Sequence, residues 1–188
     1  ESWLAWMHAN DLSPSGVSYS CVVNACAQAG DAKRAEEWMQ RMVSQGLQPS
    51  EHSYNAVIHA CARAGDVNRA EEWMQSLLSE PGRFKPNVVT YNTVIHAHAL
   101  AGNVARAEHW LMLMIQSNLM PNEVTLGSVI NACAEASDVR KAELWLQVMH
   151  DSSTWPKPNE FSYSAVIKAC VKTGSLEKAE YWVRRMVE

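Results

Sequence analysis

Tryptophan recurs along this chain at a nearly constant interval. Five tryptophans follow one another at spacings of 35, 37, 35 and 37 residues, and Trp3 precedes the first of them by a further 35. Each of the five has an alanine three residues before it and a glutamate two residues before it. The columns are Trp38, Trp73, Trp110, Trp145 and Trp182; Ala35, Ala70, Ala107, Ala142 and Ala179; and Glu36, Glu71, Glu108, Glu143 and Glu180. A fixed period of this length is typical of repeated supersecondary units, so we expect an array of such units.

Residues 51–87 show how one unit is built. Apolar residues at helical spacing in their first half predict a helix that Ser53 caps at its N-terminus and Gly65 ends. Asp66 then caps a second helix that has one apolar face. The apolar residues are Tyr54, Val57, Ile58 and Cys61 in the first helix, and Val67, Ala70, Trp73, Met74 and Leu77 in the second. Each unit is therefore predicted to be a helical hairpin.

The same pattern divides the whole chain into a single array. The predicted units are residues 16–50, 51–87, 88–122, 123–159 and 160–188, the last without its end, and residues 1–15 supply the second helix of a preceding unit. A repeat array needs polar capping units to cover the apolar faces of its terminal repeats, and neither end looks like a cap. We expect the ends to continue into further repeats or to be covered by partner proteins.

Several short motifs recur in every unit or nearly so. Tyrosine opens the first helix, Ala-Gly closes it, Ala-Glu lies in the second helix, and GLQP or LMP precedes the next unit; the stretch NVVTYNTVIHAHALAGNVARAEHWLMLMIQSNLMPN shows all of them. In these features the whole chain resembles the pentatricopeptide repeat family. The W-x-x-L-G-x-x-Y pattern of the 34-residue tetratricopeptide repeat is absent. The resemblance implies an all-α fold, a right-handed α-solenoid of antiparallel helical hairpins.

The resemblance also implies a function and a set of site residues. Family members bind single-stranded RNA, mostly in mitochondria and plastids, and one repeat reads one base. Base selection falls to the residue after the tyrosine and to the last residue of the repeat, which implies pyrimidine reading for the two Asn pairs and a purine preference for the first repeat. These pairs are Ser20 with Ser50, Asn55 with Asn87, Asn92 with Asn122, and Gly127 with Asn159, followed by Ser164 without a partner. The second residue of each repeat would stack on the base: Val17, His52, Val89, Val124 and Phe161.

The charge of the chain argues for weak binding to a polyanion. Sixteen Lys and Arg oppose twenty Asp and Glu, a formal net charge of -4. Family members commonly carry a lysine near the end of the first helix for the RNA phosphate, and here only Arg63 and Lys172 are basic in the column Gln28, Arg63, Leu100, Glu135 and Lys172. The alternative is therefore a protein-binding scaffold subunit of a large organellar assembly, such as a ribosome or a membrane-bound energy-converting complex, with little or no RNA binding.

Other chemistry finds little support in the sequence. Five cysteines without a C-x-x-C pair predict neither disulfides nor zinc, and four of them share a small-residue packing column with His98. No catalytic or phosphate-loop motif occurs, so we expect no enzyme activity, cofactor or metal in this segment. No apolar run is long enough to insert into a membrane. The Trp column is interpreted as core packing. Trp155, outside that column, is predicted to be exposed and to contact a partner.

Overall fold

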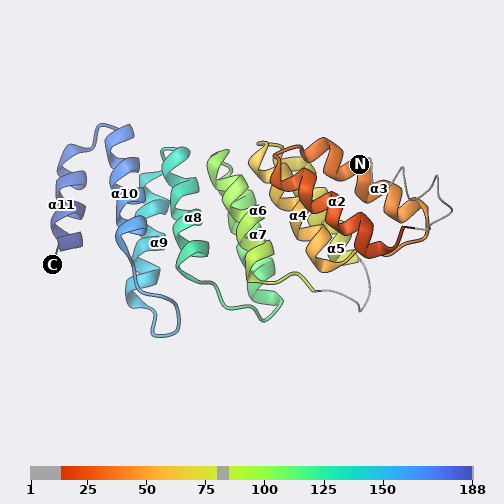
Figure 1. The fold of residues 1–188 in the computed structure, drawn as a ribbon. Coiled ribbons are helices and arrows are strands. Elements are labelled where there is room, and N and C mark those ends of the chain that lie inside the picture. The colour runs from red at the N-terminus through yellow and green to blue at the C-terminus, as the bar shows by residue number, and fades with distance from the viewer. Residues whose placement is uncertain (1–13, 80–84, 188) are drawn as a thin grey trace. The chain divides into compact units, whose positions relative to one another are not determined.

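The computed structural model describes residues 14–79 and 85–187, and the described residues form helices without any β-strand. Each helix pairs with the next one along the chain to form a hairpin (Figure 1). The hairpins are α2 (Gly16–Gln28) with α3 (Ala32–Ser44), α4 (Glu51–Arg63) with α5 (Val67–Ser79), α6 (Val88–Leu100) with α7 (Val104–Gln116), α8 (Glu123–Glu135) with α9 (Val139–Asp151), and α10 (Glu160–Lys172) with α11 (Leu176–Val187). The helix predicted within residues 1–15 lies outside the described residues.

The hairpins fall into two compact units, which divide between Pro86 and Asn87. In the first unit α2 packs against α3 and also against α4, the first helix of the next hairpin. In the second unit α8 lies between α6 and α10, as Figure 1 shows, while α7 packs against α8 and α9 against α10. Within each unit the first helices of successive hairpins are therefore neighbours.

The first helices begin three residues earlier than the sequence pattern predicts. The N-cap of α4 is Ser50, whose hydroxyl accepts the backbone N–H of Ser53 at 3.2 Å, so the prediction that Ser53 is the cap is wrong. The turn before Ser53 contains the polar residues Glu51 and His52, which the apolar periodicity could not detect. As a consequence, the last residue of each predicted repeat is the N-cap of the next first helix: Ser50, Asn87, Asn122 and Asn159.

The ends of the first helices and the starts of the second agree with the prediction. Gly65 follows α4 with φ of 77°, a left-handed conformation that suits glycine, and its N–H donates to the carbonyl of Ala62. Asp66 accepts the backbone N–H of Arg69 at 3.1 Å. In the fourth hairpin Ser137 adopts the same left-handed backbone at φ of 58°.

The tryptophan column packs against the first helix of the same hairpin. Trp110 and Trp182 are buried, as the packing interpretation predicts, whereas the other three are half-buried. Ring centroids lie between 5.9 and 6.3 Å apart in the pairs Tyr19–Trp38, Tyr54–Trp73, Tyr91–Trp110 and Tyr163–Trp182. Aromatic pairs at this separation contribute beyond the area that they bury.

Trp155 differs from its predicted exposed position. It is half-buried, and its ring stacks on that of Trp145 with centroids 6.2 Å apart and planes at 11°. Leu126 stands in the fourth hairpin where the others carry tyrosine, so Trp155 supplies the aromatic partner that Trp145 would otherwise lack. The inserted loop is held to its own hairpin, and the prediction of an exposed tryptophan is wrong.

Candidate functional site

The residues singled out by the resemblance lie along the first helices and their N-caps. In the second unit, the side chain of Asn92 on α6 donates from Nδ2 to Oδ1 of Asn122, the cap of α8, at 3.1 Å. Thr125, in the first turn of α8, donates its hydroxyl to Asn92 Oδ1 at 2.6 Å. Asn122 Oδ1 also accepts the backbone N–H of Thr125, which fixes the cap. The fold therefore brings together Asn92 and Asn122, which stand thirty residues apart in the chain.

The first unit has the same arrangement built from hydroxyl groups. Ser53, at the position equivalent to Thr125, donates to Oγ of Ser20 at 2.9 Å and lies 3.0 Å from Oγ of Ser50. Ser20 itself donates to the carbonyl of Gly16. Ser53 therefore links the Ser20 and Ser50 side chains, which do not bond to each other directly.

The other predicted base-selecting residues vary in their surroundings. Asn55 is half-buried on α4, Asn87 accepts the backbone N–H groups of Val89 and Thr90 at the start of α6, and Ser164 is exposed on α10. Asn159 caps α10 and donates from Nδ2 to Glu123 at 3.1 Å. Gly127 is buried on α8.

The predicted base-stacking positions are solvent-facing. The four apolar side chains in this column are 72%, 68%, 57% and 48% exposed, and His52 is exposed as well. The four are Val17, Val89, Val124 and Phe161. An exposed apolar residue therefore recurs at this position in four of the hairpins.

The predicted phosphate residues have different surroundings. Arg63 is exposed at the end of α4. Lys172, at the end of α10, instead forms an ion pair with Glu135 on α8, and Lys168 pairs with the other oxygen of the same carboxylate. Hydrogen bonds from Lys168 and then from Lys172 lower the pKa of Glu135 to about 2. In the free protein, Lys172 is therefore held by an internal anion.

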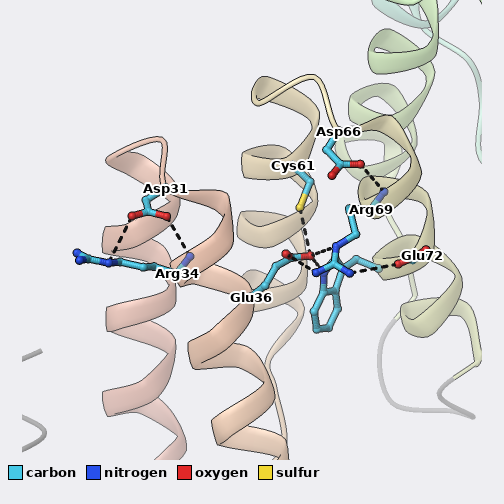
Figure 2. Close-up of polar contacts among 8 residues, drawn as sticks. Asp31, Arg34, Glu36, Cys61, Asp66, Arg69 and Glu72 are labelled. Carbon is cyan, nitrogen blue, oxygen red and sulfur yellow. Dashed lines mark hydrogen bonds and ion pairs between the residues drawn. The ribbon is translucent and has the colours of Figure 1, made fainter.

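The glutamate column has a role that the sequence analysis missed. Figure 2 shows Glu36 of α3 facing Cys61 of α4 and Arg69 of α5. Glu36 accepts from Arg69 at 3.0 and 2.9 Å, from the indole N–H of Trp73 at 2.6 Å, and from the thiol of Cys61 at 3.7 Å. Only 5% of Glu36 is exposed, so this cluster joins two hairpins through a buried carboxylate. We call these four residues the Glu36 cluster.

Two similar clusters occur in the second unit. Lys141 and Trp145 donate to Glu108 at 2.8 and 3.0 Å. In the next pair of hairpins, Lys178 and Trp182 donate to Glu143 at 2.7 and 3.1 Å. The sequence contains a pattern that could have predicted these clusters, because Arg or Lys stands four residues before each of their tryptophans.

Three of the four cysteines in the packing column are buried. Cys61, Cys133 and Cys170 are buried, and Cys26 is half-buried. Burial, followed by the charge of a nearby glutamate, raises the pKa of Cys61 and of Cys133 to about 12, which disfavours the nucleophilic thiolate. Within residues 14–79 and 85–187, no cluster of His, Cys, Asp or Glu is arranged to hold a metal ion. No helix of this described part is long and apolar enough to cross a membrane.

These features define a helical-hairpin repeat protein with a recurring polar and apolar edge on its first helices. Residues 5–141 match the family model described as the pentacotripeptide-repeat region of PRORP, and residues 161–188 match the PPR repeat model. The chain belongs to the pentatricopeptide repeat family. A comparison of the sequence with curated proteins finds no match.

Several solved structures share the fold. Maize PPR10 superimposes with a TM-score of 0.82 at 23% identity, over 95% of this chain and 25% of PPR10. PPR10 in complex with an 18-nt psaJ RNA element gives a TM-score of 0.62 at 21% identity, over 97% of this chain and 31% of that one. The PPR domain of Arabidopsis thaliana protein-only RNase P 1, in complex with tRNA, gives 0.71 at 18% identity, over 87% of this chain and 84% of that domain. The all-α helical-repeat fold of the solenoid class is thereby confirmed.

Proposed function

We propose that this chain binds single-stranded RNA along the first helices of its hairpins, with one base at each repeat. The observation that carries the proposal is the Asn92–Asn122 pair. An Asn amide has two donors and two acceptor lone pairs, and the bonds to Asn122 and Thr125 use one of each on Asn92. The remaining donor and acceptor are suited to the edge of a base.

The apolar neighbours of this pair favour a base as its ligand. Val89 precedes Asn92 by one turn on α6, and Val124 lies two residues after Asn122 in the first turn of α8. Both valines are more than half exposed. RNA modules recognise unstacked bases by hydrogen bonds to their edges and by contacts to their faces. A polar pair with an exposed valine from each of two successive hairpins meets both requirements.

The comparisons support the same class of ligand. PPR10 and the PPR domain of protein-only RNase P 1 are each described in complex with RNA. Their sequence identities to this chain are 21% and 18%, so the likeness concerns the fold, and the ligand is inferred from the side chains of this chain. We assign pyrimidine recognition to Asn92 with Asn122 and a purine preference to Ser20 with Ser50, and from the family resemblance we propose pyrimidine recognition for the repeat of Asn55.

The experiment that tests the proposal replaces one reading residue. RNA oligomers carrying each of the four bases at every position in turn are titrated against the full chain and against Asn92→Ala. We expect the variant to lose selectivity for a pyrimidine at one position, with affinity there falling about tenfold, since a specific pair of base contacts contributes about 1–3 kcal/mol. Asn68→Ala, the same change at an exposed site on the second helix α5, is the matched control. An unchanged base profile in Asn92→Ala would refute the base-reading role.

A scaffold role is the second candidate, and the electrostatics favour it. The chain carries a net charge of -4, and Glu135 already pairs with Lys172 of the predicted phosphate column and with Lys168. Single-stranded nucleic acid binding weakens with salt by about 0.7 log units per phosphate contact for each tenfold rise in salt. A chain that binds no RNA oligomer at micromolar concentrations in low salt would support a protein-binding scaffold instead.

Location and catalysis complete the proposal. From the family resemblance we propose a location in a mitochondrion or plastid, which imaging of the tagged full-length protein in its own cell tests. We assign no catalytic step to this segment, because its recurring polar side chains are engaged in helix caps, hairpin contacts and the proposed base sites. Hydrolysis of a bound RNA oligomer by the purified chain would contradict this assignment.

A further inference from the structure

The fourth hairpin lacks the reading side chain that the third one has. Gly127 stands on α8 at the position that Asn92 takes on α6. A Cβ atom at Gly127 would lie 2.5 Å from Cδ1 and 2.9 Å from Cε1 of Phe161, distances that real Cβ atoms do not show. The ring of Phe161, from the first turn of α10, therefore covers the backbone of Gly127 and fills the space of the missing side chain.

The second half of the reading pair is also altered. Asn159 caps α10 as Asn122 caps α8, and both accept the backbone N–H of the residue three positions later. Asn122 accepts from Asn92, whereas Asn159 has no such partner at Gly127 and donates its Nδ2 to Glu123 at 3.1 Å. The amide of Asn159 is thus directed to a carboxylate in the first turn of the neighbouring helix α8.

Phe161 nevertheless remains open to a ligand. Although it covers Gly127, 48% of the residue is exposed. Valine occupies the same position in the third and fourth hairpins, so the surface changes here from a small aliphatic group to an aromatic ring. Every nucleobase has a face that stacks on such a ring, and stacking depends little on which base it is.

We propose that Phe161 and Gly127 make the fourth repeat a stacking site that accepts any nucleobase without discrimination. The inference rests on the proposed RNA-binding function and deepens it, since it separates a selective repeat from a neighbouring unselective one. Phe161 supplies affinity through its ring, and Gly127 leaves room for the ring by having no side chain. The replacement of a reading side chain by a ring explains why the glycine and the phenylalanine occur in successive hairpins.

The first experiment measures affinity and base profile together on the full chain. The oligomer position that the third repeat reads is identified first, as the position at which Asn92→Ala loses base selectivity in the four-base panel. The wild-type chain is expected to show equal affinity for all four bases at the position that the fourth repeat occupies beside it. Phe161→Ala is expected to weaken binding about fivefold or more for all four bases alike, the scale of a lost base–aromatic stack. Leu144→Ala, which truncates an exposed apolar residue on the second helix α9, is the control and should leave the affinity unchanged.

The second experiment restores a reader. The double substitution Gly127→Asn with Phe161→Val copies the third repeat, and the valine gives the new amide room. A second pyrimidine-selective position is expected beside the first, while Phe161→Val alone remains unselective. Circular dichroism and a denaturation curve establish that each variant is folded, and if the double variant fails to fold, Phe161→Ala decides.

The possible outcomes separate the two proposals. Selectivity at the third repeat together with base selectivity at the fourth repeat in the wild-type chain overturns this inference and leaves the RNA-binding function standing. An unchanged affinity in Phe161→Ala also overturns it. A chain that shows no base selectivity at any position, or no binding at all, overturns both.

Discussion

The Glu36 cluster and the Asn92–Asn122 pair lie at positions that recur with the same period, but they differ in how fully their polar atoms are used. Glu36 is buried and accepts hydrogen bonds from the guanidinium of Arg69, the indole of Trp73 and the thiol of Cys61. Asn92 is half-buried and keeps one donor and one acceptor beyond its bonds to the neighbouring hairpin. Recurrence alone therefore does not mark a binding residue. The hydrogen-bonding capacity that remains after folding distinguishes the reading edge from the contacts that hold hairpins together.

The glutamate clusters themselves differ in burial and in the cation that they use. The side chain of Glu36 is 7% exposed and pairs with an arginine, while those of Glu108 and Glu143 are 25% and 23% exposed and pair with lysines. Arginine presents two N–H groups in a fixed plane, which matches a carboxylate that has little water to satisfy it. The more buried carboxylate thus has the cation with the larger number of aligned donors.

Removing the buried carboxylate is expected to have the largest effect. Glu36→Ala takes the acceptor from the indole of Trp73 and from Arg69, and the free energy of unfolding of the first unit is expected to fall by about 2–3 kcal/mol, since hydrogen bonds to charged groups are strong and Arg69 remains partly hydrated. Glu37→Ala, one residue later and exposed, is the matched control and should change stability by less than about 0.5 kcal/mol. Urea denaturation measures both, and equal losses in the two variants would refute the role of the cluster.

The sequence predicted the helices better than it predicted their contacts. Period, turn residues and apolar spacing predicted the hairpins because helix formation and burial repeat with the chain. The polar first turn before Ser53 carried no apolar signal, so the cap at Ser50 was missed. The pairing of Glu36 with Arg69, and the ring of Phe161 over Gly127, join residues of different hairpins, and such contacts depend on how neighbouring helices are aligned.

Releasing Lys168 and Lys172 near the end of α10 is expected to have an intermediate effect. It compares the buried Glu36 cluster with the more exposed ion pairs of Glu135. Of the two predicted phosphate residues, Lys172 is held by Glu135 and Arg63 is left to contact a phosphate. The logarithm of RNA affinity should therefore fall with the logarithm of salt with a slope of about -0.7. Glu135→Gln frees Lys168 and Lys172, so the slope should steepen to between about -1.4 and -2.1, with tighter binding at low salt.

A matched substitution controls for the loss of one negative charge. Glu160→Gln changes an exposed glutamate in the first turn of α10, distant from Lys172 at the other end of that helix. It should raise affinity slightly and leave the salt slope close to that of the wild-type chain. Equal slopes for the wild-type chain and Glu135→Gln would show that neither lysine contacts RNA, and would favour a scaffold role for this edge.

The smallest expected effect is the acid sensitivity of the contact between α8 and α10. The two lysines hold the folded-state pKa of Glu135 at about 2, below its ordinary value of 4.5, so the unfolded chain binds more protons in this interval. The stabilisation is complete above about pH 4.5 and is lost as the pH falls towards 2, and the partial exposure of all three side chains keeps it small. Urea midpoints at pH 6 and pH 3 should therefore fall less in Glu135→Gln than in the wild-type chain, and Glu160→Gln should follow the wild type. Because the Glu36 carboxylate is buried and that of Glu135 is partly exposed, 1 M salt should abolish the difference at Glu135 and leave the loss in Glu36→Ala nearly unchanged.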